Sequence, residues 1–247
     1  FEQFINEFPN SRYADKINDY LVEVYMTTKN YGAALTSISK IRQPSQKVLR
    51  AKQRILFQLG TQAVANSDFK GAIMQFNEVM KLGDLDRETK AEAYFWRGES
   101  LYRSTLYMQA AKDFHSFVTT TTQKDKPIYN LALYNLGYSY FKQQDFNNAM
   151  RWFNSYISAD NGKTPNMYAD ALNRLGDCYF DRRDFANAER YYERAAETQP
   201  SAADYAMYQR GFVLGLQKDY KGKIEVLNRL IREMPQSSYV DDAMYEK

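Results

Sequence analysis

The sequence predicts an all-α fold in which antiparallel helix hairpins stack into a right-handed superhelical solenoid. Three observations support this prediction. A short phrase recurs along the chain: a polar residue, an aromatic residue and, three positions later, an alanine. A glycine precedes most copies of the phrase at a nearly constant distance. Apolar residues around each copy follow the helical period and not the alternation of a β-strand.

The recurring phrase has four complete copies and two partial ones. The complete copies are Asn30-Tyr31-x-x-Ala34, Asp68-Phe69-x-x-Ala72, Asp145-Phe146-x-x-Ala149 and Asp184-Phe185-x-x-Ala188. The partial copies are Leu106-Tyr107-x-x-Ala110 and Asp219-Tyr220-x-x-Lys223. The glycines Gly60, Gly98, Gly137, Gly176 and Gly211 are spaced by 38, 39, 39 and 35 residues. This common register indicates an internal repeat.

Each part of the phrase has a physical role in a helix hairpin. Asp or Asn before the aromatic residue is a good N-cap for the second helix. Glycine and alanine allow the two helices to approach closely. Because one hairpin cannot bury its apolar face alone, neighbouring hairpins are expected to stack. We therefore expect one domain over residues 1–247, with repeats at about 13–44, 51–82, 91–121, 130–160, 169–200 and 204–235.

This pattern resembles the tetratricopeptide signature, W-x2-L-G-x2-Y…A-x3-F…P, which has a period of about 34 residues. The fifth repeat matches best, with Leu172, Leu175, Gly176, Tyr179, Ala188, Tyr192, Ala195 and Pro200. The longer period of this chain departs from the family. The additional residues lie in polar stretches such as 119–124 and 160–165, which we expect to form longer loops or additional helical turns.

The two ends of the chain carry a related phrase. Phe8-Pro9-Asn10-Ser11-Arg12-Tyr13-Ala14-Asp15 parallels Met234-Pro235-Gln236-Ser237-Ser238-Tyr239-Val240-Asp241. Half-repeats at both ends favour a piece of a longer array. The phrase is similar to a joint in bacterial cell-envelope repeat proteins, the TolA-binding family and the outer-membrane assembly lipoproteins. That resemblance implies a periplasmic or outer-membrane-associated protein; the alternative is a cytoplasmic one.

Composition argues against several classes of function. The 33 basic and 30 acidic residues are interspersed and the net charge is +3, so no basic patch for nucleic acid is expected. No run of eighteen apolar residues occurs, so we expect no direct membrane insertion in this segment. The single cysteine excludes an intrachain disulfide.

The residues needed for catalysis are scarce, so we expect no enzyme, no cofactor and no metal site. His115, the single histidine, falls between two phenylalanines on a second helix, where a surface or partly buried role is favoured. Cys178 has no histidine to activate its thiol and is expected to be a small packed residue. No P-loop or dinucleotide fingerprint is present.

One acidic stripe stands out on the first helix of the fifth repeat. Asp170, Asp177 and Asp181 share one helical face. The outer two are roughly 16 Å apart, too far for ligation of one ion. The stripe is either a solvated face or a secondary contact patch for basic residues of a partner.

The resemblance also implies that the first helices line a concave groove. The corresponding positions carry ten aromatic residues: Phe57, Phe95, Tyr102, Tyr134, Tyr138, Phe141, Phe180, Tyr205, Tyr208 and Phe212. Aromatic residues are favoured anchors of protein interfaces. We therefore predict a non-catalytic scaffold that binds a partner peptide or helix in this groove, with the strongest clustering over the third to sixth repeats.

Alternatives stay open at this stage. The inter-repeat connections could fold back and bury the aromatic side chains. The chain could be a structural spacer or assembly platform of the bacterial cell envelope, or, more distantly, a carbohydrate-binding module. The sequence names neither the partner nor the oligomeric state.

Overall fold

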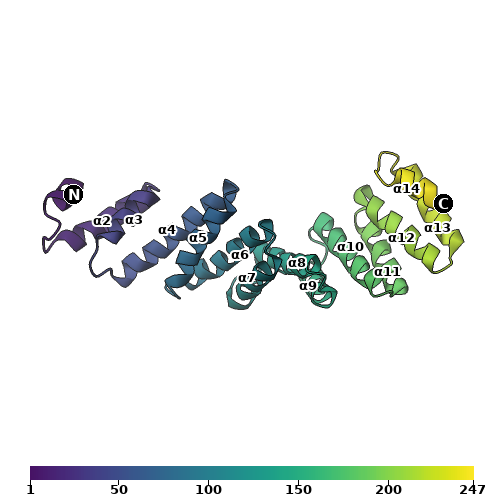
Figure 1. Cartoon of the computed structure of the whole chain (residues 1–247), viewed down its shortest axis with the longest axis horizontal. Helices are drawn as coiled ribbons and strands as arrows, with labels where there is room; N and C mark the ends of the chain where they lie inside the picture. Colours follow the sequence, from purple (N-terminus) through teal and green to yellow (C-terminus); the bar gives the residue numbers. More distant parts are fainter. The chain divides into compact units, whose positions relative to one another are not determined.

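The computed structural model describes all 247 residues, and it contains fourteen α-helices, one 3-10 turn and no β-strand (Figure 1). The predicted all-α class is confirmed. The chain divides into two compact units, residues 1–124 and residues 125–247, called the N-terminal unit and the C-terminal unit below. None of the helices combines the length and the apolar character that crossing a membrane requires.

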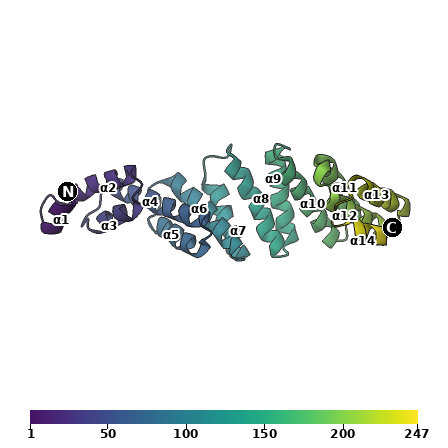
Figure 2. The same cartoon turned by 90° about the horizontal axis from the view of Figure 1, so that it is seen from above.

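The N-terminal unit consists of seven helices joined by short loops (Figures 1 and 2). They are α1 (Glu2–Glu7), α2 (Ala14–Thr27), α3 (Tyr31–Ser39), α4 (Gln46–Ala65), α5 (Phe69–Lys81), α6 (Arg87–Arg103) and α7 (Tyr107–Thr120). The pairs α2–α3, α4–α5 and α6–α7 form hairpins, and α5 also packs against α6. Each hairpin thus has a first helix and a second helix.

The C-terminal unit repeats the same arrangement. Its helices are α8 (Pro127–Lys142), α9 (Phe146–Asp160), α10 (Pro165–Asp181), α11 (Phe185–Thr198), α12 (Asp204–Leu216), α13 (Tyr220–Glu233) and α14 (Val240–Glu246). The 3-10 turn η1 (Pro200–Ala202) precedes α12. The first helices are α8, α10, α12 and α14, and consecutive hairpins pack through α9–α10, α11–α12 and α13–α14.

The recurring polar residue caps the second helix in every hairpin except α6–α7, where Leu106 takes its place. The Asp145 side chain accepts a hydrogen bond from the backbone N–H of Asn148, and Asp184 accepts one from Asn187 in the same way. This satisfies one of the first-turn amides that a helix leaves unpaired. The residue before each cap has a positive φ, for example 60° at Gln144. The repeat phrase is therefore the signal for this tight turn.

The repeat glycine marks a close contact between the two helices of a hairpin. A Cβ atom at Gly137 would lie 2.6 Å from the ring of Phe153, and one at Gly176 would lie 2.5 Å from the ring of Tyr192. In both hairpins the ring belongs to the residue sixteen positions later. Phe153 and Tyr192 are fully buried. The absence of a glycine side chain thus leaves the space that the core ring occupies.

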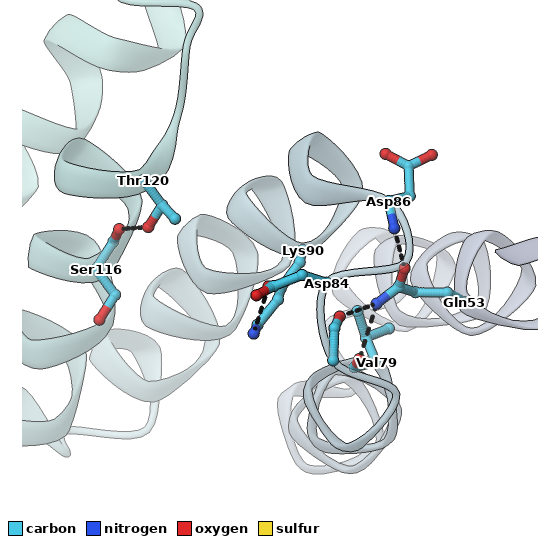
Figure 3. Close-up of polar contacts among 8 residues, drawn as sticks. Gln53, Val79, Asp84, Asp86, Lys90, Ser116 and Thr120 are labelled. Atoms are coloured by element: carbon cyan, nitrogen blue, oxygen red, sulfur yellow. Dashed lines mark hydrogen bonds and ion pairs between the residues drawn. The ribbon is translucent and has the colours of Figure 1, made fainter.

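Polar contacts join consecutive hairpins of the N-terminal unit. Gln53 on α4 is fully buried, and its Nε2 donates to the carbonyls of Val79 and Gly83 at 3.2 and 2.8 Å (Figure 3). Its Oε1 accepts from the backbone N–H of Asp86 at 2.8 Å, just before α6. One buried amide therefore fixes the loop between α5 and α6. Lys90 pairs with Asp84 of the same loop at 2.8 Å (Figure 3).

Candidate functional site

The three predicted groove residues of the N-terminal unit lie in different surroundings. Phe95 is 1% exposed and its ring contacts the rings of Phe114 and Phe117 at 5.7 and 5.5 Å. Phe95 is a core residue, so its assignment to an open groove was wrong: the helix turns this position toward the second helix α7. Phe57 and Tyr102 are half-buried. We therefore leave Phe95 out of the candidate surface.

The remaining predicted aromatics belong to the C-terminal unit and are all half-buried. They are Tyr134, Tyr138, Phe141, Phe180, Tyr205, Tyr208 and Phe212. All of them lie on the first helices α8, α10 and α12. We call the surface that these side chains form, together with the acidic residues of α10 and α14, the first-helix face.

Two tyrosines of α8 share one carboxylate of α10. The hydroxyl of Tyr134 donates to Oδ2 of Asp170 at 2.7 Å, and the hydroxyl of Tyr138 donates to the same atom. Their rings lie 4.9 Å apart. Asp170 belongs to the predicted acidic stripe, and the two tyrosines belong to the predicted aromatic groove. Their hydrogen bonds join residues from these two separate predictions.

A second carboxylate of α10 is held in a similar way. Oδ1 of Asp177 accepts from the hydroxyl of Tyr192 at 2.8 Å and from the hydroxyl of Tyr205 at 2.7 Å. Tyr192 comes from α11 and Tyr205 from α12. The Asp177 side chain is 15% exposed. Asp177 is therefore bound within the protein, and the solvated-face interpretation does not describe it.

Arg174 lies between the two carboxylates. Its Nη1 is 2.7 Å from Oδ2 of Asp177, whereas its Nε is 3.7 Å from Oδ1 of Asp170, beyond hydrogen-bond reach. The guanidinium carbon lies 5.7 Å from the Phe141 ring centre and 5.0 Å from that of Tyr205. These are distances at which a cation is attracted to an aromatic ring. Arg174 thus connects α8, α10 and α12.

The surroundings of these groups shift their pKa values. Burial, followed by the charge of Asp170, raises the pKa of Tyr134 and Tyr138 well above the usual tyrosine value. Burial also raises the pKa of Asp177, while Arg174 and the hydroxyl groups of Tyr205 and Tyr192 oppose the shift. The tyrosine hydroxyls therefore keep their protons and act as hydrogen-bond donors at neutral pH.

The C-terminal end of the face is built by α10, α12 and α14. Tyr208 stacks on Tyr239, with ring centres 5.2 Å apart, and Phe180 contacts Phe212 at 6.0 Å. Asp181, the third member of the predicted stripe, is exposed. The ion pairs of Arg174 are with Asp170 and Asp177, and neither involves Asp181.

Sequence reasoning missed two participants in the first-helix face. Arg174 follows Asp170 by four residues and precedes Asp177 by three, a spacing that places the three side chains together on a helix. That signal was available in the sequence. Tyr239 lies just before α14 and was noted only as part of the terminal phrase, because its stacking partner belongs to another repeat.

The groups considered for catalysis and metal binding differ in their surroundings. His115 is exposed on α7 in the N-terminal unit, whereas Cys178 is fully buried in the C-terminal unit. Burial raises the pKa of the Cys178 thiol to about 12, so it is protonated at neutral pH. No group of three or more His, Cys, Asp or Glu side chains is arranged to hold a metal ion.

Solved structures resemble this fold over most of the chain. The MamA protein has 20% identity and a TM-score of 0.64, covering 79% of this chain and 96% of its own. YrrB, described as a TPR protein with an unusual peptide-binding site, has 15% identity and a TM-score of 0.63, covering 77% and 91%. PilW, a type IV pilus biogenesis factor, has 15% identity and a TM-score of 0.60, covering 95% and 100%.

Family models give the more specific result. No curated protein sequence matches significantly. Models described as tetratricopeptide repeat match residues 97–164, 169–201 and 205–237, which together make up more than half of the chain. These matches agree with the helix hairpins, their capped turns and their glycine contacts. The chain belongs to the tetratricopeptide repeat family.

Proposed function

We propose that this protein is a non-catalytic scaffold that binds a peptide or a helix of another protein on the first-helix face of its C-terminal unit. The observation that carries this proposal is the set of half-buried aromatic side chains on α8, α10 and α12. Rings of this kind combine a large apolar area with a polar edge, and they are favoured at interface centres.

The hydrogen bonds beneath these rings support the same function. Asp170 and Asp177 each accept from two tyrosine hydroxyls, so the rings are held before any partner arrives. Ordering side chains on binding costs about 0.5–1.5 kcal/mol for each flexible side chain. A face that is already ordered avoids much of this cost. The fold of YrrB, whose description includes a peptide-binding site, is similar.

A test of this proposal needs residues that contact the partner but do not pack in the hydrophobic core. Tyr138 and Phe141 are unsuitable, because their rings lie 5.3 and 6.5 Å from the buried ring of Phe153. Tyr208 and Phe212 are better, because neither contacts a buried ring of a second helix. Tyr220 on α13 is 62% exposed and offers a matched control on a second helix.

We predict that a photoreactive amino acid at position 208 captures a partner protein in the native host, whereas one at position 220 does not. Phe212→Ala should then weaken binding of the captured partner by about thirtyfold, equivalent to about 2 kcal/mol, as expected for an aromatic anchor. Tyr220→Ala should leave it unchanged. Capture at position 220 alone, or full affinity in Phe212→Ala, would contradict the proposal.

A second candidate function is a spacer or assembly platform in the bacterial cell envelope. The likeness to PilW supports it, because that fold matches 95% of this chain and belongs to a type IV pilus biogenesis factor. In this role the loops and second helices would make the contacts, so capture at position 220 would favour it. Cell fractionation with an antibody against the chain tests the envelope or periplasmic location.

A further inference from the structure

In the side-chain hydrogen bonds between tyrosines and carboxylates of the first-helix face, the tyrosine hydroxyl is always the donor. Tyr134 and Tyr138 donate to Asp170, so their oxygen lone pairs and the carboxylate remain as acceptors. Tyr205 donates to Asp177 in the same way. Among the side chains of this network, Arg174 is the one that can still donate. The face therefore presents mainly acceptors to an incoming group.

A buried amide on the same helical stripe lacks a partner. Asn173 follows Asp170 by three residues and precedes Asp177 by four. It is 8% exposed, and its Oδ1 has no hydrogen-bond partner. This oxygen is enclosed by the protein, so an incoming ligand does not reach it, and recognition of a ligand rests on the carboxylates and the rings.

The charge of the face is negative although the whole chain has a net charge of +3. Asp170 and Asp177 carry two negative charges against the single positive charge of Arg174. Asp242, on the first turn of α14, is exposed and adds a further negative charge. Burial, followed by the charges of Asp242 and Glu246, raises the pKa of Tyr208, and Glu246 is itself paired with Lys223 at 2.7 Å.

Arg174 shows how the face holds a guanidinium group. Its charge lies between the rings of Phe141 and Tyr205 and is paired with carboxylate oxygen. Further rings, Tyr208 and Phe212, lie on the neighbouring helix α12. Carboxylates combined with aromatic rings suit a planar cation that stacks and donates at the same time.

We infer that the first-helix face of the C-terminal unit binds a basic, arginine-bearing segment of its partner. This inference rests on the proposed function and adds the chemistry of the ligand. The guanidinium groups of the segment donate to Asp170 and Asp242, and they stack on the rings of α12. An acidic segment meets repulsion at the same place.

Three peptides of equal length test this inference: one alternates arginine with serine, one citrulline with serine, and one glutamate with serine. Citrulline keeps the shape of arginine and removes its charge. In fluorescence anisotropy with the whole chain, the arginine peptide should bind at least about tenfold more tightly than the citrulline peptide. The glutamate peptide should not bind. Affinity should fall with added salt, since the contact is ionic.

A matched pair of variants assigns the binding to the face. Asp170→Asn with Asp242→Asn should weaken the arginine peptide by about tenfold or more. Glu197→Gln with Glu225→Gln makes the same change in net charge on exposed second-helix positions and should have no effect. Asp242→Asn alone should show part of the loss, and because this position is exposed, the fold should be retained.

Two kinds of result would overturn the inference. Equal binding of the citrulline or glutamate peptide would show that the cation is not recognised. Equal losses of affinity for the arginine peptide in both double variants would show that binding depends only on the net charge of the protein and not on the first-helix face. A third result separates the two proposals. If the arginine peptide does not bind, but Phe212→Ala still weakens binding of the partner captured at position 208, the proposed function stands and the inference of a basic ligand is wrong.

Discussion

Single residues set how closely the two helices of each hairpin approach. Four of the five repeat glycines face core rings of the second helices, with different clearances, and Gly211 faces Leu227. A Cβ atom at Gly137 would lie 2.6 Å from the Phe153 ring, whereas one at Gly98 would lie 3.1 Å from the Phe114 ring. The first distance requires the neighbouring ring to move, and the second requires only a small adjustment.

We therefore predict different costs for the same substitution at these two glycines. Gly137→Ala should lower the free energy of unfolding by about 1–3 kcal/mol, because it overpacks a closed contact. Gly98→Ala should be nearly neutral. The small adjustment of the Phe114 ring costs free energy, but alanine favours the helix over glycine by roughly 1 kcal/mol, and this gain offsets the cost. Urea unfolding followed by circular dichroism measures both. Equal effects would show that the clearance of the Cβ atom does not control stability here.

Sequence reasoning located these residues well but misjudged some of their neighbours. The period of the phrase identified the caps at Asp145 and Asp184 and the glycine at position 137, because local propensity and tertiary packing require the same residue types there. The prediction for Phe95 was wrong. Its position was assigned to the groove by analogy with the family, but its ring packs in the core against large residues of α7. Short-range patterns do not contain that information.

At the scale of helices, one buried ion pair ties a first helix to its second helix. Arg97 on α6 donates from Nε and Nη2 to both carboxylate oxygens of Asp113 on α7, at 2.6 and 2.7 Å. Its Nη1 donates to Asn77 on α5 at 2.7 Å. The Asp113 side chain is 6% exposed. The pair therefore joins three helices in the N-terminal unit.

Removing one member of this pair should be more damaging than replacing both. Asp113→Ala leaves the Arg97 charge buried without its carboxylate, and it should cost about 3–5 kcal/mol. Arg97→Met with Asp113→Leu restores an apolar contact and should recover a large part of the loss. Thermal unfolding compares the two variants. A double variant as unstable as Asp113→Ala would mean that packing, and not the unpaired charge, dominates.

Within each of the two units, the molecule is a series of hairpins in which each contacts its neighbours. The sequence predicted this architecture because most repeats carry their own cap and close contact. The network of the first-helix face was less accessible to sequence reasoning. Asp177 accepts from Tyr192 and Tyr205, which lie 15 and 28 residues away, so the network depends on the stacking of hairpins. The ring stacking of Tyr208 on Tyr239 depends on it in the same way.

This architecture predicts that damage stays local. The stability of a repeat array is approximately a sum of terms for each repeat and for each contact between neighbours. In hydrogen exchange, Asp113→Ala should therefore accelerate exchange of amides in α4–α7 and leave α10–α13 unchanged. Gly137→Ala should accelerate exchange in α8–α11 and leave α2–α5 unchanged, because these helices belong to the other compact unit. Partial opening of this kind is expected where cooperative units are contiguous segments. Uniform loss of protection along the chain in either variant would instead show that both units unfold as one.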